Sequence, residues 1–147
     1  MVSFHTPVML EKVLQSLRCK PGGIYVDGTL GGGGHARAIL ENTAPDGLLI
    51  GLDRDDDALL ESEKRLQPFG QRKILIKGNF ADIGEILTNL NIRKVDGILL
   101  DLGVSSHQLD TADRGFSFSL DAPLDMRMDQ SSRFSAYDLV NLSPEKE

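Results

Sequence analysis

The sequence predicts an α/β fold built on a doubly wound, Rossmann-like parallel sheet. Short segments that are nearly all apolar alternate with segments in which apolar residues recur every three or four positions, as strands and helices do in βα repeats. The apolar segments show little alternation, so helices are expected to cover both faces of the sheet. A glycine-rich run, "DGTLGGGGHAR" (residues 27–37), follows the first apolar segment and is typical of a turn from a strand into a helix.

Residues 1–19 are predicted to form an N-terminal helical segment. Thr6 has the properties of an N-cap and Pro7 those of a first helical residue. The apolar positions that follow lie on one face of a helix: Leu10, Val13, Leu14 and Leu17. The stretch "KPGG" at residues 20–23 ends this helix.

Residues 20–101 contain the βα repeats. Strands are predicted at residues 24–27, 48–53, 73–79 and 95–101. Helices follow the first three strands, at residues 35–42, from Asp55 or Asp56 onward, and at residues 81–90. Right-handed crossovers between parallel strands then give the doubly wound arrangement.

Residues 102–147 lack the repeating strand and helix pattern of the preceding residues. Residues 102–133 show little periodicity and are predicted to form a long loop beside the cleft. Residues 134–147 are predicted to begin a helical region, with a helix at 134–142 and Ser143 and Pro144 as the cap and first residue of another. We therefore expect the 147 residues to be the N-terminal portion of one larger domain, with the sheet truncated after its fourth strand.

Composition narrows the class of protein. No apolar run approaches the length of a membrane span, and the N-terminus lacks the pattern of a secretory signal. The single cysteine, Cys19, favours a reducing cytoplasm and offers no cluster of metal ligands. The net charge of −6 argues against a general polyanion-binding surface. The sequence thus predicts a cytoplasmic protein with no metal site and no membrane partner.

Polar residues end all four predicted strands: Asp27, Asp53, Asn79 and Asp101. The carboxyl ends of parallel strands meet at one edge of a sheet, where ligands bind. Asp and Asn also begin turns, and for any one of them that reading is the simpler one. Four such residues at corresponding positions favour a shared site.

The glycine run is compatible with two cofactors. Gly31, Gly33 and Ala36 fit the loose dinucleotide pattern G-x-G-x-x-A, and Asp53 follows 20 residues after Gly33. A dinucleotide would bring a pyrophosphate against an acidic edge, whereas S-adenosylmethionine carries a sulfonium and an ammonium group that this edge attracts. Asp53 would accept the ribose hydroxyls and Phe80 would offer an apolar face to adenine. S-adenosylmethionine is therefore preferred, with a nicotinamide-dependent oxidoreductase as the alternative.

Several longer motifs carry a resemblance to a known family. In order along the chain they are "HTPVML", "YVDGTLGGGGH", "GLDRDDDA", "GNF", "DGILLDLGVSSHQLD", "RGFSF" and "PLDMRMD", between His5 and Asp129. They closely resemble the RsmH (MraW) family of S-adenosylmethionine-dependent methyltransferases, which modify the exocyclic N4 of a cytosine in small-subunit ribosomal RNA. The resemblance implies a fold of the class I methyltransferase type and small ribosomal subunit RNA as the partner.

The resemblance also implies which residues contact the cofactor. They are Gly33, Gly34, His35, Asp53, Phe80, Asp101 and Gln108. Taken from the residues alone, His35 is better explained as a helix cap; the resemblance favours a ligand contact. Asp101 is the first candidate for the acceptor of the substrate amine's proton, by its position, with Asp125 behind it. A cofactor contact with no role in proton transfer explains Asp101 equally well. Arg114 and Arg127 are expected to orient the carboxylates of the loop.

Two expectations limit the activity of this chain. Family members are longer, so the chain is expected to be an incomplete and poorly active part, or a non-catalytic fragment that binds cofactor. Residues 101–130 hold six aspartates and two arginines, a local net charge of −4. The positively charged groups that bind RNA phosphates are therefore expected to lie elsewhere.

Overall fold

The computed structural model describes residues 7–144, which form two compact units, residues 7–102 and residues 103–144. The first unit contains a four-stranded parallel sheet in the order β3-β2-β1-β4. Its strands are β1 (Ile24–Asp27), β2 (Leu48–Asp53), β3 (Lys73–Lys77) and β4 (Gly97–Leu99). This confirms the predicted α/β class and places β1 in the interior of the sheet, between β2 and β4.

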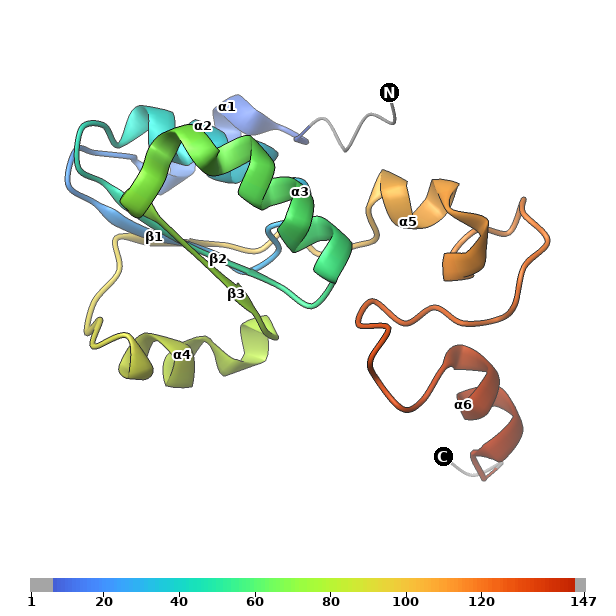
Figure 1. Cartoon of the computed structure of the whole chain (residues 1–147). Coiled ribbons are helices and arrows are strands. Elements are labelled where there is room, and N and C mark those ends of the chain that lie inside the picture. The colour runs from blue at the N-terminus through green and yellow to red at the C-terminus, as the bar shows by residue number, and fades with distance from the viewer. Residues whose placement is uncertain (1–6, 145–147) are drawn as a thin grey trace. The chain divides into compact units, whose positions relative to one another are not determined.

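Helices cover both faces of this sheet (Figure 1). Helices α1 (Leu10–Leu17), α2 (Gly34–Asn42) and α3 (Asp56–Leu66) lie on one face, and α4 (Ile83–Asn89) lies on the other. Two 3-10 helices, η1 (Gln67–Arg72) and η2 (Phe80–Asp82), precede β3 and α4. No helix in residues 7–144 is both long enough and apolar enough to span a bilayer.

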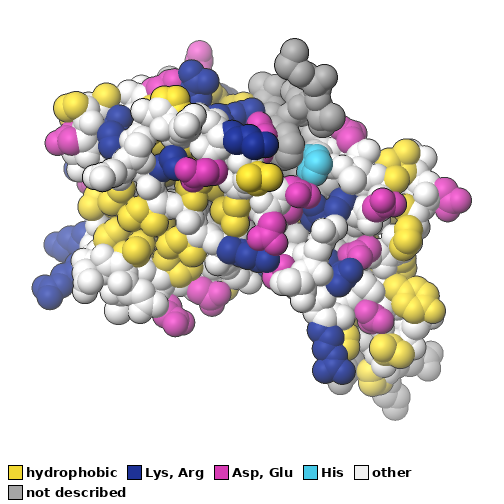
Figure 2. Space-filling model, in the orientation of Figure 1, with side chains coloured by type: hydrophobic (Ala, Val, Ile, Leu, Met, Phe, Trp, Pro, Cys, Tyr) yellow, Lys and Arg dark blue, Asp and Glu magenta, His cyan; other side chains and the backbone are white. Residues whose placement is uncertain are grey.

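The core is divided between the two faces by the period of two along each strand. Tyr25 and Leu49 face α2 and pack with Ile39. Val26 and Ile50, the next residue of each strand, belong to the cluster under α4. The strands read as continuously apolar because both faces are buried. The edge strand β3 is less covered, and Figure 2 shows hydrophobic side chains at the surface over it, between α3 and α4.

The fourth strand is shorter than predicted. Residues 95–101 were expected to be extended, but β4 pairs with β1 only from Gly97 to Leu99. Side chains interrupt the ladder at both ends: the Asp96 carboxylate accepts the N–H of Ile24 at 2.9 Å, and the N–H of Asp101 donates to Thr29 Oγ1 at 2.7 Å. The strand therefore ends two residues before Asp101.

The first helix begins later than predicted. Helix α1 starts at Leu10, and Met9 before it has a left-handed backbone, so the expectation that Pro7 is the first helical residue is wrong. The segment before the helix is held against α2, where the ring of His35 bonds the Val8 carbonyl oxygen. Thr6, the predicted cap, lies outside the described residues.

The second unit contains two α-helices and a 3-10 helix joined by irregular chain. They are α5 (Ser106–Asp110), η3 (Ala112–Arg114) and α6 (Ala136–Leu142). Helix α5 interrupts the loop predicted for residues 102–133, and a capping box between Ser105 and Gln108 sets its start. Helix α6 confirms the helix predicted at 134–142. The helix predicted after Ser143 would continue beyond the described residues and stays a prediction.

Candidate cofactor site

Three of the four predicted strand-end residues bring carboxyl groups to one edge of the sheet. Asp27 and Asp53 are the last residues of β1 and β2, and Asp101 follows β4 by two residues. The negative charges of Asp53 and Asp101 both contribute to raising the pKa of Asp27, so the three groups lie within electrostatic reach of one another. The carboxyl edge is thus acidic over three neighbouring strands.

Asp27 is the most buried of these groups, with 1% of its surface exposed. Its Oδ1 accepts the N–H of Thr29 at 3.1 Å and the Thr29 hydroxyl at 3.5 Å. Its Oδ2 is buried and has no hydrogen-bond partner within the described part of the chain. Burial, followed by the charges of Asp53 and Asp101, raises the pKa of Asp27 to about 7.

Asp53 holds the glycine-rich loop and the start of α3 at the same time. Its Oδ2 accepts the N–H of Gly31 at 2.8 Å, and its Oδ1 accepts the N–H of Asp55 at 2.9 Å. Burial raises the pKa of Asp53, and the backbone hydrogen bonds act against that rise. A carboxylate has about four acceptor positions, so Asp53 can still accept a hydroxyl from a ligand.

The glycine loop needs its glycines for its own folding. Gly31 and Gly33 have φ values of 51° and 73°, in the left-handed region that side chains disfavour. The hydroxyl of Ser62 on α3 donates to the Gly31 carbonyl at 2.7 Å. A Cβ at Gly33 would come within 2.9 Å of the same hydroxyl oxygen. Close packing of the loop on α3 therefore accounts for part of the glycine content without any ligand.

His35 connects the N-terminal segment to the acidic edge. Its Nε2 lies 3.0 Å from the Val8 carbonyl oxygen, which only accepts, so Nε2 carries the hydrogen and donates it. Its Nδ1 lies 3.9 Å from Asp101 Oδ2. The helix cap of α2 is Gly33, without a side-chain hydrogen bond, so the alternative reading of His35 as a cap is wrong. Gly34 lies beside it, where a Cβ would come 3.0 Å from Pro7.

Phe80 and Asn79 follow β3 and take different roles. Phe80 is 38% exposed, and its Cβ lies 3.0 Å from the position of a Cβ on Gly28, at the start of the glycine loop. An exposed aromatic ring beside this loop is consistent with the predicted apolar contact. The Asn79 side chain accepts the N–H of Ala81 at 3.1 Å and caps η2, so the turn-forming reading holds for this residue.

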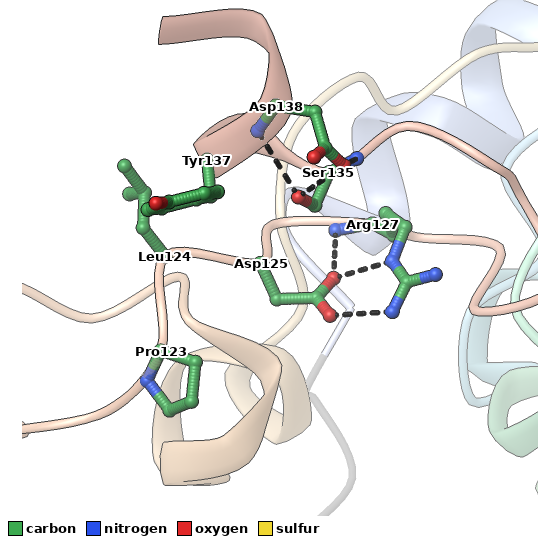
Figure 3. A pocket seen from close by; sticks show the side chains of 7 residues that line it. All are labelled: Pro123, Leu124, Asp125, Arg127, Ser135, Tyr137 and Asp138. Carbon is green, nitrogen blue, oxygen red and sulfur yellow. Dashed lines mark hydrogen bonds and ion pairs between the residues drawn. The ribbon is translucent and has the colours of Figure 1, made fainter. Parts of the chain in front are cut away.

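Gln108 and Asp125, also predicted as site residues, belong to the second unit. Gln108 is buried and its Oε1 accepts the N–H of Ser105 at 3.0 Å. Asp125 is bound on both oxygens by Arg127, from Nε at 2.9 Å and from Nη2 at 2.7 Å (Figure 3). Arg127 thereby lowers the pKa of Asp125. The predicted orienting role of Arg127 is confirmed, and the Asp125 carboxylate is a weak proton acceptor.

Asp125 lies in a pocket of the second unit (Figure 3). The residues that line it are Pro123, Leu124, Asp125, Arg127, Ser135, Tyr137 and Asp138. Arg114 supports the same segment by donating from Nη2 to the carbonyl oxygens of Arg127 and Met128. Both arginines thus organise the chain around the pocket.

Two residues that shape the acidic edge were not predicted from the sequence. Thr29 bonds Asp27 through its N–H and hydroxyl, and its hydroxyl oxygen accepts the N–H of Asp101, so it links two of the three carboxyl-bearing segments. Its position two residues after a strand-end aspartate is a recognisable turn signal. Ser62 holds the glycine loop from α3, and nothing in the local sequence indicates that contact.

The described residues contain no group of three or more His, Cys, Asp or Glu side chains arranged to hold a metal ion. A parallel sheet with a glycine loop after its first strand and ligand-accepting groups beyond the strand ends defines the class of Rossmann-like cofactor-binding domains.

Comparison with known proteins agrees with this class and narrows it. The solved structure of NSun6 from Pyrococcus horikoshii with SFG has the same fold, with a TM-score of 0.52 at 22% sequence identity, covering 67% of this chain and 24% of that one. The model of the MraW methylase family matches residues 2–147. The chain belongs to the MraW methylase family, as the sequence motifs predict.

Curated relatives carry the name ribosomal RNA small subunit methyltransferase H. The protein of Syntrophus aciditrophicus is 63% identical over 145 residues, 99% of this chain and 46% of that protein. The protein of Syntrophotalea carbinolica is 65% identical over 143 residues, 97% of this chain and 46% of that protein. The chain thus spans about half the length of the curated relatives it matches.

Proposed function

We propose that this chain supplies the S-adenosylmethionine site of a methyltransferase that modifies the exocyclic N4 of a cytosine in small-subunit ribosomal RNA. The observation that carries the proposal is the acidic carboxyl edge formed by Asp27, Asp53 and Asp101 in a member of the MraW methylase family. The names of the curated relatives support ribosomal RNA as the substrate class.

The residues at the edge fit a cationic cofactor better than a dinucleotide. The negative charges of Asp53 and Asp101 would repel a pyrophosphate and attract an ammonium or sulfonium group, and the buried Oδ2 of Asp27 offers an acceptor with no hydrogen-bond partner among the described residues. Asp53 retains acceptor positions for the ribose hydroxyls, and the exposed ring of Phe80 is available to adenine. In this proposal Gly33, Gly34, His35 and Gln108 complete the cofactor contacts.

S-adenosylmethionine supplies, when bound, a methyl group on a positively charged sulfur. The part of the chain is to hold a substrate amine in line with that methyl group and to accept a hydrogen bond from it as positive charge develops on nitrogen. Asp101 suits this role because 41% of its side chain is exposed and it lies at the acidic edge. Asp125 is the second candidate, weakened as an acceptor by its ion pair with Arg127.

Isothermal titration calorimetry tests the cofactor proposal directly. We expect S-adenosylhomocysteine to bind this chain and NAD to give no heat of binding under the same conditions. A preference for NAD would overturn the proposal and favour the oxidoreductase alternative. Methyl transfer from labelled S-adenosylmethionine to unmodified small ribosomal subunits, with Asp53→Ala as the control variant, tests the substrate.

The RNA partner is tested by fluorescence anisotropy with ribosomal RNA fragments. We expect weak binding to this chain even at low salt, because residues 101–130 carry a net charge of −4 and the whole chain a net charge of −6. Tight, strongly salt-dependent binding would show that the electrostatic grip on RNA lies within these 147 residues after all.

A further inference from the structure

We propose that Asp27 is a proton-linked binding residue: it holds a proton in the free chain and releases it to solvent when the positively charged group of the cofactor binds at the acidic edge. The inference rests on the proposed function, because it takes the ligand to be S-adenosylmethionine or its product. It adds a binding role for a residue outside the set of predicted cofactor contacts, and it couples binding to pH.

The position of Asp27 in the sheet is the first support for this role. Asp27 ends the interior strand β1, where Gly51 of β2 pairs with it on one side and Leu99 of β4 on the other. It is 1% exposed, whereas the Asp101 side chain at the same edge is 41% exposed. Of the two, Asp27 is the group that water cannot stabilise as an anion.

The hydrogen bonds of Asp27 are the second support. Both of the donors placed on it come from Thr29, and both meet Oδ1. Oδ2 is buried and unpartnered among residues 7–144, unlike the two oxygens of Asp53, each of which accepts a backbone N–H. A carboxylate with one bare, buried oxygen is poorly stabilised as an anion, so the neutral acid is favoured until a cation arrives.

The charges around Asp27 act in the same direction. The groups that interact with it electrostatically are Asp53 from the end of β2 and Asp101 from the segment after β4, and both are acidic. The imidazole of His35, at the start of α2, also lies at this edge, with its Nδ1 3.9 Å from Asp101 Oδ2. With the pKa of Asp27 at about 7, the free chain holds this proton over the lower part of the physiological range.

The direction of the pH effect on cofactor binding follows from the thermodynamic linkage between proton release and binding. A cation at the edge stabilises the Asp27 anion and lowers its pKa, so binding expels the proton that the free chain still holds. From a free pKa of about 7, release is about 0.9 proton at pH 6 and about 0.1 at pH 8. The dissociation constant is correspondingly about tenfold weaker at pH 6 than at pH 8.

Calorimetry in two buffers of different ionisation enthalpy measures the released protons. At pH 6 we expect about 0.9 proton per bound cofactor. S-adenosylmethionine and S-adenosylhomocysteine are compared, since both carry the ammonium group and only the former carries the sulfonium. Release with both ligands assigns the ammonium to Asp27, and release with S-adenosylmethionine alone assigns the sulfonium. Release with neither overturns the inference.

The variant Asp27→Asn keeps the shape of the side chain and removes the proton. We expect the proton release to disappear and the affinity to become independent of pH between 6 and 8. Glu41→Gln, at an exposed position paired with Arg37 on α2, is the matched control and should leave proton release unchanged. Proton release that persists in Asp27→Asn would assign the linkage to another group and overturn the inference.

A titration of the free wild-type chain keeps the test independent of how Asp27→Asn folds. Carbon NMR of the aspartate carboxyl groups should show Asp27 titrating with a midpoint near 7, and a midpoint below 5 overturns the inference whatever the ligand does. Cofactor binding without proton release overturns this inference alone. No binding of either cofactor at pH 8 overturns the proposed function as well.

Discussion

The two units of the chain hold their carboxylates in opposite electrostatic settings. At the carboxyl edge of the first unit, burial raises the pKa values of Asp27 and Asp53, and the hydrogen-bond donors that reach them come from backbone N–H groups and a threonine hydroxyl. In the second unit, the guanidinium of Arg127 lowers the pKa of Asp125, and the N–H and hydroxyl of Ser135 lower that of Asp138.

This difference indicates which carboxyl groups remain available to a ligand. The Asp125 carboxylate is satisfied within its own loop, and it keeps that loop in shape. Among the described residues no cation is paired with the buried carboxyl groups of Asp27 and Asp53, an arrangement that destabilises the fold and persists mainly at functional sites. Acidic residues alone therefore do not mark a site.

The largest expected effect is on cofactor binding by Asp53→Ala. The variant removes the proposed acceptor for the ribose hydroxyls and releases the N–H groups of Gly31 and Asp55, so binding should weaken by about 1–3 kcal/mol. Calorimetry with S-adenosylhomocysteine measures the change, and Asp53→Asn, which keeps one acceptor oxygen, should lose less. An unchanged affinity would remove Asp53 from the site.

The next effect is on the pH dependence of stability. Because the folded pKa of Asp27 is about 7, far above its unfolded value, the native state binds the proton more tightly than the unfolded state. Its contribution to the free energy of unfolding is therefore fully present only below the unfolded pKa, and it falls by about 2 kcal/mol between pH 5 and pH 7 as the pH rises towards the folded pKa. Urea denaturation at both pH values measures it, and Asp27→Asn should flatten the trend.

The same experiment extended to lower pH separates the two units. Arg127 and Ser135 lower the pKa values of Asp125 and Asp138, so their stabilisation is present above the ordinary aspartate pKa and is lost as the pH falls below it. The second unit should thus lose stability on acidification in a range where Asp27 is already protonated. A common pH profile for probes in both units would contradict the comparison.

A smaller effect is expected from Arg127→Ala. The variant removes the two side-chain hydrogen bonds to Asp125 and two more to the carbonyl oxygens of Gln130 and Ser132. The free energy of unfolding should fall, and by less than for a fully buried pair, since this pair is partly exposed to solvent. Arg127→Lys cannot form the bidentate pair and should recover only part of the loss. Full recovery in thermal melts would show that charge alone matters.

The smallest effect is expected from Ser62→Ala. It removes the buried hydroxyl that donates to the Gly31 carbonyl oxygen and should cost about 1 kcal/mol of stability. Hydrogen exchange of the glycine-loop amides is the sharper measurement, because it reports the loop alone. Exchange rates equal to those of the wild type would show that Asp53 is sufficient to hold the loop.

Much of the first unit could be predicted because its signals are local. The bounds of β1 and β2 match the prediction residue for residue, since apolar runs ended by aspartates leave little choice. The start of α1 could not be predicted, because Pro7 and Val8 are held by Gly34 and His35 of a different helix. Helix α5 was missed although its capping pair, Ser105 and Gln108, is visible in the sequence.

The candidate site shows the same division. The strand-end rule brings Asp27, Asp53 and Asp101 to one edge without any knowledge of tertiary contacts. The burial that distinguishes Asp27 from Asp101 depends on the whole sheet and its covering helices, so no short segment indicates it. The sequence predicts that Arg127 orients carboxylates of the loop. That its ion pair makes the Asp125 carboxylate a weaker proton acceptor follows only from the distances in the structure.

The outer side of β4 has a practical consequence for handling the protein. Within residues 7–144 this strand pairs with β1 alone, and Ile98 and the following Leu100 are 47% and 45% exposed. An edge strand with exposed aliphatic side chains is a template for strand pairing between molecules. Concentrated samples should therefore self-associate, and light scattering across a dilution series would reveal the concentration below which binding data describe single molecules.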